Sequence, residues 1–209
     1  MLENVFVQEK LQKTISFASL FVLTFECFKD MVIDRPRSFY CLSNMRFEDG
    51  KCICPETDEY KHEVRNLEKK PLHASMRWFV SRGAIVDSDL QRVVEIELRR
   101  NDFVHELFNT VNYGISELDI QLFADLISIY KKIDSWWIYN VEIDWDEIKD
   151  TDSVKMEECF SCALAMIDAM VSILLKGEGD TYRKCYMQIK DAVTGKVGNN
   201  ITSSNRATS

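Results

Sequence analysis

Apolar residues recur at every third or fourth position along most of this sequence, and few helix-breaking residues interrupt them. The 209 residues include only 7 glycines and 3 prolines, too few for a turn-rich β-sandwich or β-barrel. A spacing of three and four residues is typical of a helix with one apolar face. The sequence therefore predicts an all-α protein, a bundle of about five to six helices. The first apolar stripe consists of Leu11, Ile15, Ala18, Val22, Phe25 and Phe28.

Helix-breaking residues predict where each helix ends. Pro36 should end the first helix, because the residue before a proline is pushed out of the helical region. Residues 35–56 contain two of the three prolines and are expected to form an irregular connection. Residues 1–193 form one domain in this prediction, whereas residues 194–209 lack apolar spacing and are expected to be a disordered tail. The predicted helices cover residues 4–33, 58–80, 87–111, 116–137, 154–175 and 182–193.

Charge and cysteine content limit the classes of protein to which the chain can belong. It has 26 basic and 34 acidic residues, a net charge of −8, so a nucleic acid would have to bind to a local basic patch. Seven cysteines in no regular framework indicate reduced thiols and a cytoplasmic protein. The N-terminus is polar and acidic, unlike a secretory signal, and the apolar run from Phe17 to Phe28 is too short to span a bilayer. We therefore expect no membrane association.

One segment of the chain departs from this acidic balance. Residues 61–100 hold nine basic residues against six acidic ones, which gives the segment a net charge of +3. Lys69, Lys70, Arg77 and Arg82 lie in it and are candidates for contacts with RNA phosphate groups. The alternative is that they belong to an ordinary solvated helix face, and the sequence leaves both interpretations open.

The third predicted helix carries polar residues on a face that is otherwise apolar. Glu97, Asn101 and His105 follow one another at intervals of four residues, so they lie in line along the helix. Buried polar groups are costly unless each is paired. The face therefore allows three interpretations: a functional site, a satisfied buried network or a hydrated subunit interface. The apolar residues assigned to it are Leu90, Val93, Val94, Leu98, Val104, Phe108 and Val111.

A short motif lies towards the end of the same predicted helix. The residues from Arg100 to His105 read Arg-Asn-x-x-x-His, and an apolar pair, Leu107-Phe108, follows them. This pattern resembles the signature of HEPN domains, which are all-α proteins with an arginine, a polar residue and a histidine at short spacing. The resemblance predicts that the motif residues form the functional site.

Two other segments extend the resemblance. Residues 67–72 are similar to the helix that precedes the motif in a bacterial HEPN-like group. Glu26, together with Lys29 and Asp30, resembles a further polar position of some HEPN members. As an architecture, the resemblance covers residues 10–175.

The resemblance implies a metal-independent endoribonuclease that works as a homodimer, as bacterial toxins and antiphage-defence effectors of this kind do. Its catalytic residues would be Arg100, Asn101 and His105, with Glu97 and Arg99 in support. A histidine can take the proton of the RNA 2′-OH or protonate the leaving 5′ oxygen. An arginine can hold the phosphate and stabilise its charge in the transition state. Arg99 fits the motif with one more intervening residue, so either arginine can carry this role.

The implied partners are RNA, a second copy of the chain, and a cognate antitoxin or regulatory protein. No metal and no other cofactor is expected. Cys52, Cys54, Cys159 and Cys162 have a spacing that can supply four thiolates to one zinc ion. However, Cys159 and Cys162 lie in an apolar helical stretch, where packing as small core residues is the simpler interpretation.

Two other classes of function remain open. One is a non-catalytic HEPN-like bundle that binds a partner protein or a nucleotide. The other is an unrelated helical interaction module in which Arg100 and His105 have the motif spacing by chance.

Overall fold

The computed structural model describes residues 7–48, 50–146 and 154–177, and it confirms the all-α fold. The chain divides into two compact units, residues 1–167 and residues 168–209. The boundary falls after Ile167, within the last described α-helix, so all the earlier helices and both strands belong to the first unit. The described part contains the helices α1 (Gln8–Cys41), α2 (Asp58–Glu63), α3 (Pro71–Ser81), α4 (Asp87–His105), α5 (Leu107–Tyr113), α6 (Glu117–Trp137) and α7 (Cys162–Val171), and the strands β1 (Arg46–Glu48) and β2 (Lys51–Ile53).

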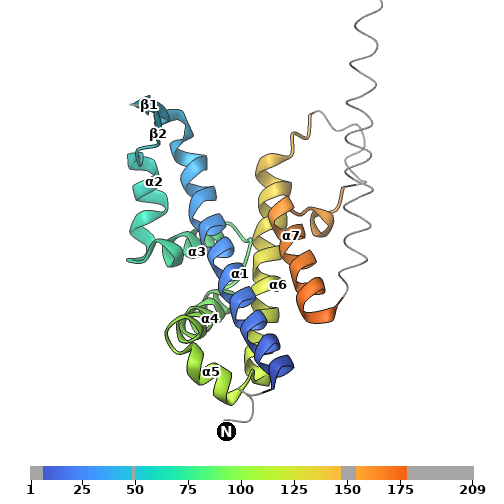
Figure 1. The fold of residues 1–209 in the computed structure, drawn as a ribbon. Coiled ribbons are helices and arrows are strands. Elements are labelled where there is room, and N and C mark those ends of the chain that lie inside the picture. Colours follow the sequence, from blue (N-terminus) through green and yellow to red (C-terminus); the bar gives the residue numbers. More distant parts are fainter. Residues whose placement is uncertain (1–6, 49, 147–153, 178–209) are drawn as a thin grey trace, which may run out of the picture. The chain divides into compact units, whose positions relative to one another are not determined.

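Helix α1 is the longest element, and α3, α4, α5 and α6 all pack against it (Figure 1). Phe17, Phe21, Phe25 and Phe28 are buried along one side of α1. Burial of this apolar face against the other helices explains why the segment is helical.

The prediction that Pro36 ends the first helix was wrong, because α1 continues to Cys41. Pro36 is buried inside the helix, and the neighbouring Arg35 is held by two tertiary contacts. The Arg35 guanidinium donates to Asp134 Oδ1 at 2.7 Å and lies 5.6 Å from the centre of the Trp137 ring. These contacts with α6 keep the chain helical around a proline that the local rule would place at a helix end.

The connection expected to be irregular contains a small hairpin. Strands β1 and β2 pair antiparallel, with Phe47 opposite Cys52. Gly50 lies in the turn between them with a φ angle of 73°, a conformation that glycine adopts at little cost. Strands of three residues are too short to show a period of two in the sequence, so the prediction missed them.

The helix expected over residues 58–80 is divided into α2, a 3-10 turn at Arg65–Leu67, and α3. Pro71 is the first residue of α3, and Lys70 before it is extended. Proline favours the first position of a helix and excludes helical geometry from the residue before it. The rule that failed at Pro36 therefore applies at Pro71.

The helix expected over residues 87–111 is also two helices. Glu106, with φ −126° and ψ 31°, separates α4 from α5. Its carbonyl oxygen accepts the backbone N–H groups of Asn109 and Thr110 at 2.9 and 3.1 Å, so a new helix begins there. Neither glycine nor proline marks this break, which is why the sequence did not indicate it.

Helix α6 begins at the predicted place because its first turn is capped. The Ser116 side chain accepts the N–H of Asp119 at 3.2 Å, and the Asp119 carboxylate accepts the N–H of Ser116 at 2.8 Å. This reciprocal pair is a capping box, in which each side chain satisfies one of the free N–H groups at the helix start.

An aromatic cluster joins α1, α4 and α6 in the core. Phe103 of α4 packs its ring 5.0 Å from that of Phe21 and 6.2 Å from that of Phe17. Phe123 of α6 lies 5.4 Å from Phe17 and 5.6 Å from Phe21. This cluster fixes the second half of α4 against α1, which positions the motif residues.

Among the described helices, none combines the length and the apolar character that crossing a bilayer requires. The helix expected at 182–193, the domain end expected at residue 193 and the expected tail at 194–209 lie outside the described residues.

Candidate active site

All the motif residues lie on α4. The Asp89 carboxylate stabilises the start of this helix, since it accepts the N–H of Val86 at 3.1 Å and the ammonium group of Lys132 at 2.8 Å. Val93 and Ile96 are fully buried beneath the helix. The apolar spacing therefore fixes which side of α4 faces the core and which side remains open.

Arg100 points towards α1 and forms an ion pair with Glu26. Its Nη1 also donates to Asn101 Oδ1 at 3.1 Å, and its guanidinium lies 5.9 Å from the centre of the Phe25 ring. Its Nε–H is buried and has no hydrogen-bond partner among the described residues. The Arg100 guanidinium is thus partly enclosed, and one of its donors is unsatisfied.

Glu26 is shared by two cations, because Lys29 pairs with its second carboxylate oxygen. Burial by itself would raise the pKa of Glu26. The hydrogen bonds and charges of Lys29 and Arg100 outweigh that effect and lower the pKa, so the carboxylate stays charged. Glu26 had been singled out only through the family resemblance, and the structure places it against Arg100.

Arg99 points to the opposite side, towards the start of α6. Its Nε donates to Asp119 Oδ1 at 2.5 Å and its Nη2 to Asp119 Oδ2 at 3.1 Å. Its guanidinium also lies 4.4 Å from the centre of the Phe103 ring. Arg99 therefore ties α4 to the capped first turn of α6, with both prongs of its guanidinium already occupied.

Glu97 is paired within the chain, with residues of α3 and its N-terminal edge. Both of its carboxylate oxygens accept from Lys70 Nζ, at 3.1 and 3.2 Å, and Oε2 also pairs with His73 Nε2 at 3.0 Å. Burial would raise the pKa of Glu97, but hydrogen bonds from Lys70 and His73 outweigh it and lower the pKa. The first polar residue of the predicted ladder is thus satisfied.

The other two residues of the ladder face outwards. Asn101 is half-buried, and its side-chain oxygen is held by Arg100. His105 is the last residue of α4 and is exposed, and its ring has no hydrogen-bond partner among the described residues. The imidazole is therefore free to meet a substrate or a partner.

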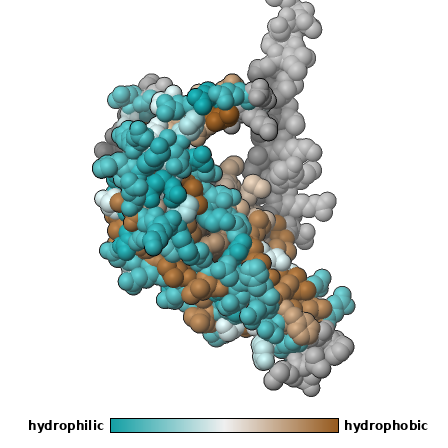
Figure 2. Space-filling view, turned by 90° about the vertical axis from the view of Figure 1, so that its left-hand side faces the viewer, coloured by the Kyte–Doolittle hydropathy of each residue, from teal (hydrophilic) through white to brown (hydrophobic). Residues whose placement is uncertain are grey.

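The predicted apolar face of this helix is split into two. Leu90, Val93 and Val111 are buried, as expected for one side of the core. The prediction of a single buried face was wrong for the remaining members, which are exposed. Their exposed fractions are 38% for Val94, 62% for Leu98, 44% for Val104 and 70% for Phe108. The hydrophobic spacing alone does not distinguish the buried residues from the exposed ones. The apolar stripe is wider than the area that the neighbouring helices cover, so the residues at its edge remain exposed. Figure 2, which views the side of α4 and α5, shows apolar residues interrupting the polar surface there.

An apolar groove lies beside the Arg100–Glu26 pair. Its volume is about 410 Å³, and Val22, Leu23 and Glu26 of α1 form one wall. Phe103 and Leu107 form the other. A ligand that approaches Glu26 through this groove therefore meets mainly apolar surface.

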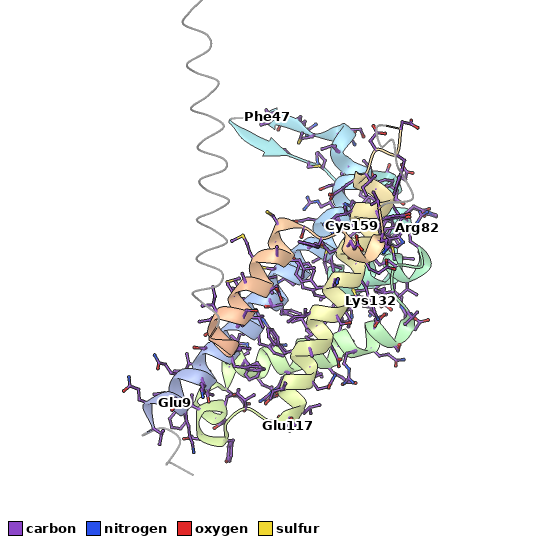
Figure 3. All side chains as sticks on the ribbon, turned by 90° about the vertical axis from the view of Figure 1, so that its right-hand side faces the viewer. Glu9, Phe47, Arg82, Glu117, Lys132 and Cys159 are labelled. Atoms are coloured by element: carbon purple, nitrogen blue, oxygen red, sulfur yellow. The ribbon has the colours of Figure 1, made fainter. Side chains whose placement is uncertain are left out.

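The four candidate phosphate contacts lie on α3 or at its ends, and three of them already have partners within the chain. Lys70 pairs with Glu97, and Arg77 pairs with Asp87 at 2.6 Å. Arg82 lies 5.3 Å from the centre of the Trp78 ring. In Figure 3, Arg82 is far from Glu117, the first residue of α6, near which the Arg99–Asp119 pair holds the end of α4.

Lys69 differs from the other three. It is exposed and has no partner among the described residues. Its neighbour Lys70, which is 62% exposed, contacts the motif helix through Glu97.

No group of three or more histidine, cysteine or acidic side chains in the described ranges is arranged to hold a metal ion. Cys54 instead donates its thiol to the carbonyl oxygen of Cys41 at 3.2 Å. The side chains at the motif are those of Arg100, Asn101 and His105, together with the carboxylates of Glu26 and Glu97.

Sequence reasoning did not identify His73 and Asp119 as neighbours of the motif. Each lies on another helix, 24 and 20 positions from its partner, Glu97 and Arg99 respectively. Helical spacing reports which residues share a face of one helix, not which residue of another helix meets it. Only the capping position of Asp119, after Ser116, is visible in the sequence.

Comparison of the chain with protein-family models, with curated proteins and with solved structures found no match.

Proposed function

We propose that this chain is a metal-independent endoribonuclease of HEPN type that acts as a homodimer. The observation that carries the proposal is the arrangement of the motif on α4. Arg100 is held against α1 by Glu26 and contacts Asn101, while His105 stands exposed at the end of the same helix. Together these side chains supply a phosphate-binding cation and a proton-transfer group.

The reaction can proceed with these groups alone. One imidazole takes the proton from the RNA 2′-OH, whose oxygen then bonds to the adjacent phosphorus. The bond from phosphorus to the 5′ oxygen breaks, and a second imidazole gives that oxygen a proton. The guanidinium of Arg100 neutralises the extra charge on the phosphate. The products are a 2′,3′-cyclic phosphate and a 5′-hydroxyl.

A dimer is part of the proposal because one chain cannot present all of these groups to one phosphate. Arg100 and His105 are five residues apart, which separates them by about 140° around the helix axis. A single chain also offers only one His105. Two copies that face each other across the exposed side of α4 would supply two imidazoles and two guanidinium groups to a shared cleft.

Of the two arginines, Arg100 fits the role better. Arg99 has both guanidinium prongs bound to Asp119, whose carboxylate is buried. Arg100 retains an unsatisfied Nε–H and adjoins Asn101. Binding of a phosphate would require Arg100 to exchange part of its contact with Glu26 for the substrate.

The wider context completes the proposal. The substrate is cellular RNA in the cytoplasm, and the protein acts as a bacterial toxin or an antiphage-defence effector. A cognate antitoxin or regulatory protein then restrains it. These points rest on the resemblance of the Arg100–His105 motif to HEPN domains.

A non-catalytic HEPN-like module that binds a partner protein or a nucleotide is the second candidate. The observation that favours it is the ion pair of Arg100 with Glu26, which neutralises the arginine in the free chain. In that case Arg100 would only fasten α4 to α1.

Cleavage of labelled RNA by the pure protein in EDTA distinguishes the two candidates. The endoribonuclease cuts RNA without a metal ion, and His105→Ala lowers the rate about 10²- to 10⁴-fold, the usual effect of removing one acid–base group. His62→Ala is the matched control, because His62 is also an exposed histidine but lies on α2. Absence of cleavage by the wild-type protein would favour the non-catalytic module.

A further inference from the structure

The apolar groove beside the Arg100–Glu26 pair takes no part in the proposed cleavage step. It extends for about 12 Å along α1, from Ala18 to Glu26. Leu23 on this wall is 43% exposed, and Leu107 on the other wall is 39% exposed. Exposed apolar side chains on both walls would gain free energy if a ligand with apolar faces covered them.

One end of the groove carries a carboxylate. Glu26 lines the groove and is half-buried, and its Oε1 pairs with Arg100 while its Oε2 pairs with Lys29. When a phosphate takes over the Arg100 guanidinium, as the proposed function requires, Oε1 loses a donor and can accept another hydrogen bond. A ligand of this groove therefore needs an apolar body and an N–H donor at the end that meets Glu26.

The groove also lies next to the position proposed for the phosphate. Phe103 in its wall is about 60° from Arg100 around the α4 axis, and Asn101 is about 100° from Arg100 in the other direction. Arg100 thus lies between the groove and the rest of the motif. A phosphate bound to Arg100 has the groove on one side, so a nucleotide attached to that phosphate can reach into it.

We infer that the groove binds the nucleobase adjacent to the cleaved phosphate and that Glu26 selects a base with an exocyclic amino group, which adenine, cytosine and guanine have. The inference rests on the RNA substrate of the proposed function and adds a determinant of the position at which the RNA is cut. A nucleobase has flat faces that pack on apolar walls, and it carries its hydrogen-bonding groups at the edge. Uracil has no amino group, and its one ring N–H lies between two carbonyl oxygens, which a carboxylate repels.

Binding of oligonucleotides that cannot be cut tests this selection without relying on cleavage. Hexanucleotides of 2′-O-methyl adenosine, cytidine or uridine are titrated against the full-length protein. The adenine and cytosine hexamers should bind at least about 10-fold more tightly than the uracil hexamer, because each gains one hydrogen bond to a charged group.

The variant Glu26→Gln should bring the ratio of these affinities to about 1, because an amide can also donate to a carbonyl oxygen of uracil. The ratio is taken within one protein, so a smaller folded fraction of the variant does not change it. Glu9→Gln, which alters an exposed glutamate of the same helix, is the matched control and should keep the wild-type ratio.

Photo-cross-linking of the wild-type protein locates the base. The cytosine hexamer carries one 5-iodocytosine, which retains the exocyclic amino group, and the cross-linked peptides are identified by mass spectrometry. We expect products at residues 18–26 and 103–107, the two walls of the groove.

The other outcomes contradict the inference. Equal wild-type affinities for the three hexamers, or cross-links only outside the two walls, would show that the groove does not select a base. An unchanged ratio in Glu26→Gln would show that Glu26 is not the selecting residue. Cleavage of RNA in EDTA together with equal affinities would overturn the inference and leave the proposed function intact. The expected preference in a protein that does not cleave RNA would do the reverse, and absence of binding to all three hexamers would contradict both.

Discussion

Arg100 of α4 and Glu26 of α1 form an ion pair although 74 positions separate them in the sequence. The pair fastens the motif helix to the longest helix of the protein, at the point where Asn101 and the apolar groove adjoin. Arg100 therefore has two functions in our account. It stabilises the α1–α4 contact in the free protein and binds phosphate in the complex with RNA.

Replacing Glu26 by Gln should destabilise the protein by about 1–3 kcal/mol. The charged hydrogen bond to Arg100 is removed, and a partly buried guanidinium then lacks its counter-charge. The free energy of unfolding in urea measures the change. Glu9→Gln is the control, because Glu9 forms an exposed pair with Lys13 and its replacement should have no measurable effect. Equal stability of the Glu26→Gln and wild-type proteins would show that the pair does not support the fold.

Asp119 should make the protein less stable in acid. Burial alone would raise the pKa of Asp119, but hydrogen bonds from Arg99 and Ser116 outweigh it and lower the pKa below its usual value. The stabilisation is therefore fully present above the pKa of an unfolded aspartate, about 3.9, and is lost as the pH falls through the lower folded value.

The variant Asp119→Asn tests this pH dependence. It should be less stable than the wild type at pH 7 and should lose less stability when the pH is lowered from 4 towards 2. Urea unfolding at a series of pH values gives both curves. Parallel curves over the acid range would mean that another carboxylate accounts for the acid sensitivity.

Leu98→Glu should convert the proposed dimer into a monomer. Leu98 is exposed in the single chain, so the change should leave the fold intact. It places a charge on the exposed side of α4, through which the proposed dimer forms. Light scattering should then give a mass near that of one chain, 24.4 kDa. Leu118→Glu is the matched control, since Leu118 is an equally exposed leucine on α6, and it should remain dimeric. A wild-type protein that is itself monomeric at micromolar concentration would contradict the dimer.

Reversing the charges of Lys69 and Lys70 should weaken RNA binding and reduce its dependence on salt. For a single-stranded RNA, removing one lysine–phosphate interaction lowers the slope of log affinity against log salt concentration by about 0.7. Titration of labelled RNA at several salt concentrations measures the slope. The control is the double variant Lys131→Glu, Lys155→Glu, which changes the charge equally at two other exposed lysines. If both double variants keep the wild-type slope, the RNA binds elsewhere.

The sequence was sufficient to predict the fold class and the start of α6. Apolar spacing identifies α1 and α6 because each buries one long stripe, and Ser116 marks a helix start by local chemistry. The ends of elements were less predictable. Pro36 lies inside a helix because Asp134 and Trp137 hold its neighbour, and such tertiary contacts leave no local signal.

The candidate site was only partly predictable for the same reason. The motif spacing selected Arg100, Asn101 and His105, and helical geometry correctly aligned them on one element. It did not indicate that Val94, Leu98, Val104 and Phe108 would remain outside the core, because the width of a buried stripe depends on the neighbouring helices. The partners of Arg99 and Glu97 are set by contacts between helices, which one sequence does not reveal.

The measurement that tests the central claim most directly is cleavage of RNA in EDTA, compared with the same RNA carrying one 2′-deoxynucleotide at the mapped cleavage position. Our account requires the 2′-OH as the nucleophile, so the all-RNA substrate should yield a 2′,3′-cyclic phosphate, detected by mass spectrometry. The substituted substrate should resist cleavage at that position, and Arg100→Ala should abolish cleavage of the unmodified RNA. Equal cleavage of both substrates, or a strict requirement for Mg²⁺, would contradict the account.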